Sequence, residues 1–170
     1  MRLCRDPELG LDLPRTQERV LAWLQGPPLE VSTGRSLSSI TAVLRGGAGN
    51  GAAVLLRTDM DALPVTEQTG LDFAARAGRM HACGHDLHTA MLAGEAACWL
   101  RTVMRWPGCR LHVPTRRGGH DGARHMIEEG VLEAAGQPLA AAYAVHVLSA
   151  WPRGSLRDQA RADPGRGGRA

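Results

Sequence analysis

The strongest restriction on the fold is an alternation of short apolar runs with segments of helical spacing. Two continuous apolar runs, at 53–57 and 140–148, predict buried strands. Apolar or small residues recur at helical spacing in three segments, which are 14–24, 85–100 and 121–129. Strands that alternate with helices are typical of layered α/β folds, so we expect a sheet flanked by helices.

Length and composition favour one domain without a membrane span. A chain of 170 residues, 44% of them hydrophobic, is long enough to bury a core of its own. No apolar run approaches the ~20 residues that a membrane helix needs. Residues 1–14 carry charges and lack the apolar segment of an export signal, so we expect a cytoplasmic protein. The four cysteines form no paired framework and are expected to be reduced thiols or ligands.

All 20 basic residues are arginine, although the net charge is only +3. Half of them fall in two groups: Arg101, Arg105, Arg110, Arg116 and Arg117, and then Arg153, Arg157, Arg161, Arg166 and Arg169. A nucleic-acid surface is one interpretation, but the only aromatic residues near these groups for base stacking are Trp99, Trp106 and Trp151. We therefore expect no nucleic-acid partner. The Arg/Gly-rich tail at 151–170 shows no periodicity and is expected to be disordered.

The densest group of metal-binding residue types is HACGHDLH, at 81–88. Thiolate and imidazole groups are strong ligands of zinc and similar ions, and a Cys-x-His spacing lets Cys83 and His85 reach one ion. The segment that follows has helical spacing, so the group lies where a loop enters a helix. A short Cys/His group is also a frequent structural accident, and this interpretation stays open from the residues alone.

Two acids and one further histidine accompany this group. Asp59 and Asp61 directly follow the apolar run at 53–57, where carboxylates are well placed to bind a metal or orient a histidine. The alternative is a solvated turn capped by aspartate. His146 lies within the second apolar run, where a lone histidine is more often a core residue than a ligand; a nearby metal would reverse that judgement.

Two long stretches, LLRTDMDALPVTEQTGLDF and GRMHACGHDLHTAMLAGEA, follow one another in the chain. Together with PELGLDLPRTQ upstream, and DGARHMIEEGVLEAAG and HVLSA downstream, they resemble the amidohydrolase branch of the dinuclear-metal aminoacylase and carboxypeptidase family. That branch contains hippurate hydrolases and auxin-conjugate hydrolases. The resemblance covers the chain from about Pro7 to Ala150.

The resemblance implies an α/β catalytic domain with a mixed sheet, into which a smaller lid and dimerisation domain is inserted. Residues 1–150 would be an incomplete catalytic domain that lacks the insertion. The implied reaction is hydrolysis of the amide bond of a small N-acyl amino acid by metal-activated water. Cys83 and His85 match the family's ligand pair, His146 matches a further ligand, and Asp61 matches the acid that orients the site. The family binds two divalent ions, and the residues do not distinguish zinc, manganese, cobalt and nickel.

One family motif is missing. Where the family carries a segment similar to TFQPGEEG, with a general-base Glu and a ligand Glu, this chain has Arg116 and Arg117. Arginine neither binds a cation nor accepts a proton at neutral pH. Codons compatible with residues 113–119, read one base later, encode Phe-Gln-Pro-Gly-Glu-Glu-Gly. We therefore interpret the chain as a truncated, frameshifted member, with 97–119 out of frame.

The expected function is therefore a metal-dependent amidohydrolase by descent, inactive as written because the Glu pair is absent. The alternative is a non-catalytic protein that keeps Cys83, His85 and His146 as a single metal site.

Overall fold

The computed structural model describes residues 2–26, 28–47, 51–76, 78–99, 109–113 and 122–156. The helices are α1 (Arg2–Arg5), α2 (Pro14–Trp23), α3 (His85–Trp99) and α4 (Gly122–Glu128). The strands are β1 (Leu29–Thr33), β2 (Ile40–Leu44), β3 (Ala53–Arg57), β4 (Cys109–Val113) and β5 (Leu139–Ala144). The three helices expected from periodicity are present, each shorter at its ends by one or two residues.

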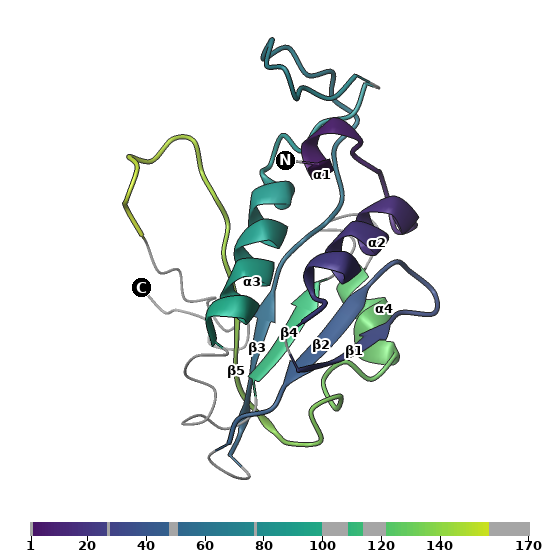
Figure 1. The fold of residues 1–170 in the computed structure, drawn as a ribbon, viewed down its shortest axis with the longest axis vertical. Helices are drawn as coiled ribbons and strands as arrows, with labels where there is room; N and C mark the ends of the chain where they lie inside the picture. The colour runs from purple at the N-terminus through teal and green to yellow at the C-terminus, as the bar shows by residue number, and fades with distance from the viewer. Residues whose placement is uncertain are drawn as a thin grey trace, which may run out of the picture.

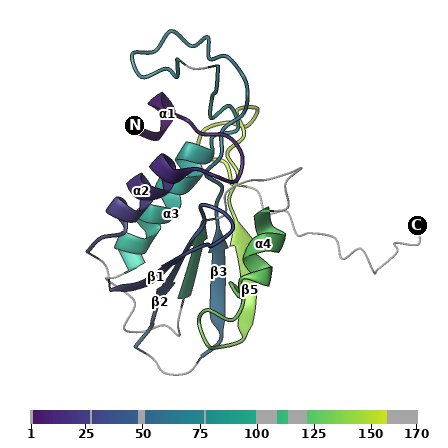
Figure 2. The same ribbon diagram turned by 90° about the vertical axis from the view of Figure 1, so that its right-hand side faces the viewer.

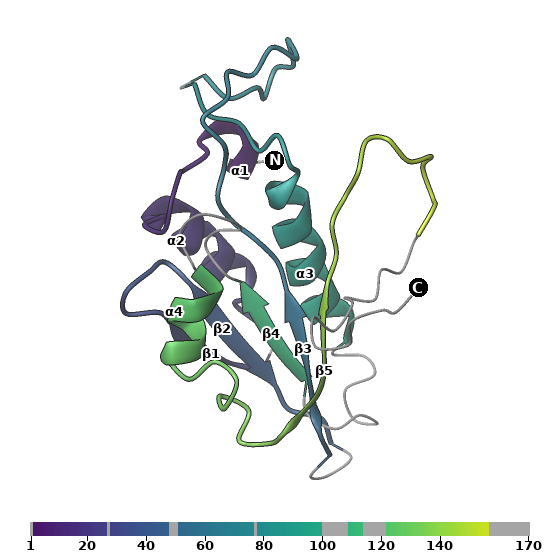
Figure 3. The ribbon, with the colours of Figure 1, turned by 180° about the vertical axis from the view of Figure 1, so that it is seen from behind.

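The strands form one mixed sheet in the order β1-β2-β4-β3-β5 (Figure 1). Strands β1 and β2, and β2 and β4, pair antiparallel, whereas β3 pairs parallel with both β4 and β5. In Figure 2, α2 and α3 lie on one side of the sheet and α4 lies on the other. Figure 3 shows α4 from behind, across β2 and β1. The expected α/β fold with a helix-flanked mixed sheet is confirmed.

The main core lies between the sheet and the layer of α2 and α3. On β2, the alternate residues Ile40, Ala42 and Leu44 face this layer. The other members of the core are Leu13, Val20, Leu24, Met60, Leu92 and Ala96. Val43 belongs instead to a cluster with Ala53 and Ala135 on the opposite face. Burial on both faces explains why β2 and β3 are continuous apolar runs rather than alternating ones.

The expectation of a buried strand over 140–148 is wrong in two respects. Strand β5 ends at Ala144, and most of its residues are exposed, with Tyr143 at 61%. The physical reason is its place in the sheet, because β5 pairs with β3 alone among the described strands and forms an edge. Strand β4 was not expected, since Arg110 and His112 interrupt its apolar pattern.

Several expectations fall on parts of the chain that the structure does not describe. Arg116 and Arg117, most of the segment 97–119 and most of the tail at 151–170 lie outside the described residues. Within the described residues, every helix is too short or too polar to cross a bilayer.

A buried carboxylate holds the start of α2. The side chain of Glu8 is buried and accepts hydrogen bonds from the backbone N–H groups of Thr16, at 2.7 Å, and Arg15, at 3.4 Å. The Arg15 guanidinium also donates to Glu8, at 3.1 Å. These N–H groups belong to the first turn, where the helix supplies no acceptors. Glu8 also accepts a bond at its backbone carbonyl from Ala62 N, so it ties α2 to the loop after β3.

Burial opposes ionisation of Glu8, but the N–H donors of Thr16 and Arg15 outweigh it, and the pKa of Glu8 is lowered. We expect Glu8→Gln to lower the free energy of unfolding at pH 7 by about 1–3 kcal/mol, because the amide turns a donor toward the buried N–H groups. Exposed Glu18 on the same helix supplies the matched variant Glu18→Gln, for which we expect a change within ~0.5 kcal/mol. Urea denaturation measures both.

The lowered pKa of Glu8 also determines how its contribution to stability depends on pH. The stabilisation from ionised Glu8 is present above the carboxyl's unfolded pKa of about 4.3 and is lost as the pH falls through the lower folded value. The difference between Glu8→Gln and the unaltered chain should therefore shrink in acid. A difference that grew with falling pH would contradict the role of the carboxylate.

Candidate metal centre

The parallel pairing of β3 with β5 brings the candidate residues together. Arg57 at the end of β3 is in register with Ala144 at the end of β5. Asp59 and His146 each lie two residues beyond these ends. Because parallel strands end at the same edge of a sheet, both residues emerge on one side, together with Asp61.

The tight turn before α3 adds His85 and His88 to this edge. Gly84 has a φ of +77°, and its backbone carbonyl accepts the first helical hydrogen bond, from His88 N at 3.0 Å. A Cβ at Gly84 would collide with the side chain of Val147. Glycine is thus required here both for its φ and for the close approach of the segment after β5. His85 and His88 are three residues apart and share one face of α3.

His85 is fixed with one ring nitrogen free for a ligand. Its Nδ1 lies 2.8 Å from the backbone oxygen of Asp61 and 3.1 Å from Asp61 Oδ1. Both oxygens are acceptors, so Nδ1 carries the proton and Nε2 presents its lone pair. This is the arrangement by which a carboxylate orients a metal-binding histidine.

His146 also carries its proton on Nδ1. The ring of His88 is held differently, through its Nε2. His146 Nδ1 lies 2.7 Å from the carbonyl oxygen of Val147, which again leaves Nε2 unprotonated. His88 Nε2 instead accepts a hydrogen bond from Val147 N at 2.9 Å. The ring centroids of His146 and His88 are 4.7 Å apart, and those of His146 and His85 are 6.3 Å apart. His88 therefore holds the segment that carries His146.

Asp59 faces His85 from the end of β3. Its Oδ2 is 3.5 Å from His85 Nε2, and its Oδ1 is 2.7 Å from the Arg57 guanidinium. Thr89 donates to the backbone oxygen of Asp59 at 2.7 Å. One possible ligand atom each from Asp59, His85 and His88 lies within 4.8 Å of the others, and all three residues are buried. This is a second candidate ligand set, which shares His85 with the set expected from the sequence.

Cys83 and His146 line one pocket of about 640 Å³ beside this cluster, together with His81. Cys83 is a partly buried free thiol. Both ring nitrogens of His81 are buried and have no hydrogen-bond partner among the described residues. The acids on the pocket wall are Glu67 and Asp86.

The protonation of the histidines follows from their surroundings. Burial opposes protonation of His85, but the hydrogen bond with Asp61 and the charges of Asp59 and Asp61 outweigh it and raise the pKa of His85. Burial, and then the neighbouring imidazoles of His146 and His85, lower the pKa of His88 to about 4. His88 is therefore neutral at pH 7, as its acceptor role toward Val147 N requires. Burial likewise lowers the pKa of His81.

The structure thus brings Asp61, His85 and His146 together and places Cys83 on the adjoining pocket wall. His88 was not expected from the sequence to have a role, and the role of Asp59 stayed open. The i, i+3 spacing of His85 and His88 could have indicated that both share a helix face, and the position of Asp59 after β3 was an available signal.

A model of the peptidase family M20/M25/M40 matches residues 55–160. The chain belongs to this family. It is 37% identical over 152 residues to thermostable carboxypeptidase 1 of Saccharolobus solfataricus, covering 87% of this chain and 38% of that protein. It is 33% identical over 158 residues to the IAA-amino acid hydrolase ILR1-like 5 of Arabidopsis thaliana, covering 91% of this chain and 35% of that protein.

A solved structure gives the same result. The YXEP protein of Bacillus subtilis, described as a dinuclear metal binding peptidase from the M20 family, is 31% identical with a TM-score of 0.79. The match covers 88% of this chain and 41% of that one. The M20 chain therefore spans about two fifths of the length of its relatives, and the resemblance to the amidohydrolase branch is confirmed.

The M20 chain's turn before α3 can be tested with a pair of glycine variants. We expect Gly84→Ala to destabilise the fold by ~1–2 kcal/mol for the positive φ and by a further ~1–3 kcal/mol for the collision with Val147. Gly78 has a φ of +63° and open space around it, so Gly78→Ala carries only the first cost. Equal losses in urea denaturation would show that Val147 does not press on the turn.

Proposed function

We propose that this chain descends from a metal-dependent hydrolase of N-acyl amino acids, that it holds a divalent ion through Cys83, His85 and His146, and that it does not hydrolyse amides as it stands. The proposal is supported by the family, whose relatives include an amino-acid conjugate hydrolase and a carboxypeptidase. It is a proposal because the chain spans only about two fifths of those relatives.

The observation that carries the metal proposal is the orientation of the two imidazoles. His85 and His146 each have Nδ1 engaged by oxygen acceptors, so each directs an unprotonated Nε2 elsewhere, that of His85 toward Asp59 Oδ2 at 3.5 Å. His88 has its Nε2 occupied by Val147 N. A ligand role for His88 through Nε2 would break that bond, which supports the sequence-derived set. Among the described residues, however, the ligand atoms that lie within 4.8 Å of one another are those of Asp59, His85 and His88, so the two sets have to be separated by experiment.

The residues around the ligands have separate tasks. Asp61 orients His85, Arg57 holds the carboxylate of Asp59, and His88 holds the backbone that carries His146. A divalent ion held here would supply Lewis-acid polarisation of a carbonyl and activation of water. Removal of an orienting partner of this kind typically weakens metal binding about 10–100-fold.

The lack of activity is inferred from the acids around the pocket. Among the described residues that line it, the carboxylates are those of Glu67 and Asp86. Glu67 accepts bonds from Thr69 Oγ1 and Ala75 N, and Asp86 accepts one from the Cys4 thiol at 2.8 Å. Glu67 holds the loop that contains Thr69 and Ala75, and Asp86 links α3 to α1, so we infer that neither acts as a general base. The segment with Arg116 and Arg117 lies outside the described residues.

The second candidate function is a non-catalytic protein with one metal ion. The observation in its favour is that the proposed ligands and their orienting partners all lie between Arg57 and His88 or at 146–147. None depends on the segment where the Glu pair is missing. Tight metal retention without hydrolysis fits both candidates, and only a cellular role for the metal-bound chain separates them.

Metal content after dialysis tests the ligand set. We expect the chain to retain close to one zinc ion, and we expect His85→Ala and His146→Ala each to weaken binding by at least about a hundredfold. His125→Ala on α4 is the matched control and should leave binding unchanged. With cobalt, Cys83→Ser should abolish a thiolate-to-metal absorption band. Retention in His146→Ala with loss in His88→Ala would favour the alternative ligand set.

Hydrolysis of N-benzoylglycine by the zinc- and manganese-loaded chain tests the proposal that the chain does not hydrolyse amides. We expect no turnover above that of the His85→Ala variant, because general-base catalysis contributes about 10²–10⁴-fold and we infer no base among the described residues that line the pocket. Turnover by the unaltered chain would contradict this. Resequencing codons 95–170 then shows whether the frameshift is real or a sequencing error. A restored Glu pair would mean that the natural protein carries the complete motif.

A further inference from the structure

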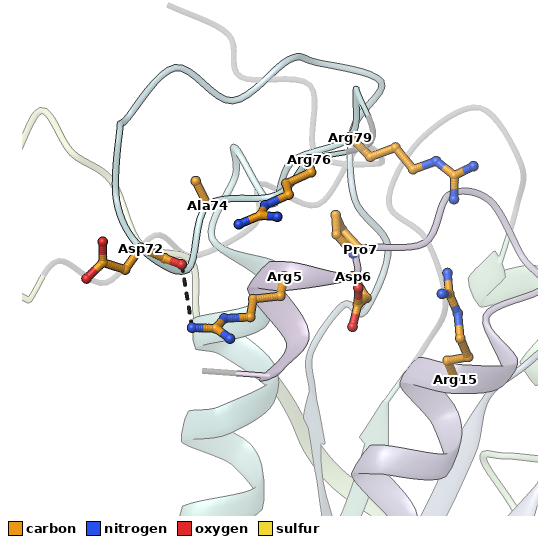
Figure 4. A pocket seen from close by; sticks show the side chains of 8 residues that line it. All are labelled: Arg5, Asp6, Pro7, Arg15, Asp72, Ala74, Arg76 and Arg79. Atoms are coloured by element: carbon orange, nitrogen blue, oxygen red, sulfur yellow. Dashed lines mark hydrogen bonds between the residues drawn. The ribbon is translucent and has the colours of Figure 1, made fainter.

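Four arginines surround a second pocket, of about 370 Å³, outside the metal centre (Figure 4). They come from three segments: Arg5 from α1, Arg15 from α2, and Arg76 and Arg79 from the loop before α3. In Figure 4, Arg15 extends from α2 toward Arg79, while Arg5 and Arg76 reach the other end of the pocket.

The positive charge of this arginine pocket is only partly neutralised. Asp6 and Asp72 are the acids on its wall, and Asp6 is paired with Arg19 at 2.7 Å. Arg15 uses its Nε toward Glu8. Arg5 donates to the backbone oxygen of Asp72, at 3.5 Å, and not to a carboxylate. Among the contacts between described residues, Arg76 and Arg79 have no ion pair. Guanidinium groups thus exceed the carboxylates available to them.

The arginine pocket and the pocket beside the metal centre lie on two sides of the same wall. Along the loop, Leu71 and Phe73 line the pocket of the metal centre, whereas Asp72 and Ala74 line the arginine pocket. Along α1, Cys4 lines the former and Arg5 lines the latter. The two pockets share no lining residue, so the arginines do not belong to the metal centre.

We propose that the arginine pocket binds a small multivalent phosphoryl anion, such as a phosphorylated metabolite. Guanidinium groups form paired, charge-assisted hydrogen bonds with phosphoryl oxygens. Donors that come from three segments and lie at both ends of one pocket suit an anion that presents oxygens in several directions better than a single planar carboxylate. A multivalent anion also replaces the carboxylates that Arg76 and Arg79 lack.

Titration calorimetry of the full chain with inorganic pyrophosphate, at low and constant ionic strength, tests the site. We expect one molecule to bind, and we expect the double variant Arg76→Gln/Arg79→Gln to bind at least about tenfold more weakly. The double variant Arg35→Gln/Arg153→Gln removes the same charge from exposed positions outside the pocket and should bind within about twofold of the unaltered chain.

A variant that removes a negative charge from the pocket tests the proposal without replacing any arginine. Asp6→Asn removes a carboxylate from the wall and should tighten binding. Absence of heat from the unaltered chain with a native circular dichroism spectrum would overturn the proposal, as would equal weakening in the two double variants. Binding of citrate as tight as that of pyrophosphate would overturn the assignment to a phosphoryl group.

Discussion

The parallel register of β3 and β5 is the constraint on which the candidate metal centre depends. It places Arg57 opposite Ala144, so that the chain leaves both strands at one edge and Asp59 and His146 emerge together. A slip of one residue would turn every side chain of β5 to the opposite face. The contact at Gly84 fixes the same arrangement from the other direction, because the turn before α3 closes directly on Val147.

The residues that the sequence alone could predict are those placed by short-range structure. Asp61 follows a strand, and His85 begins a helix after a glycine turn, so both positions can be inferred within a few residues. The roles of His88 and β5 could not be inferred. The acceptor role of His88 Nε2 is determined by its hydrogen bond from Val147 N, which lies 59 residues away in the chain. The exposure of β5 depends on the order of the strands, and an apolar run does not encode whether it becomes a central strand or an edge.

Under the proposed function, metal binding and proton transfer depend on separate parts of the sequence. The proposed ligands and the groups that orient them lie before residue 90 or directly after β5, whereas the family's acid pair belongs to the segment at 113–119. The segment interpreted as out of frame, 97–119, contains neither His85 and His146 nor the groups that hydrogen-bond to their Nδ1 atoms. Under the proposed function, this separation would let the chain bind a metal through the two imidazoles without the family's acid pair.

Two kinds of arginine can be distinguished among the described residues. Arg45 donates from two nitrogens to Glu30, at 2.6 and 2.8 Å, and Arg57 is paired with Asp59, so their charges are balanced where they stand. Arg76 and Arg79 belong to the other class, because they border a pocket whose acids do not balance them. Composition cannot separate these classes, since every cation in the chain is arginine. The distinction depends on α1, α2 and the loop before α3 meeting at one place, and all three precede the segment where the family motif is lost.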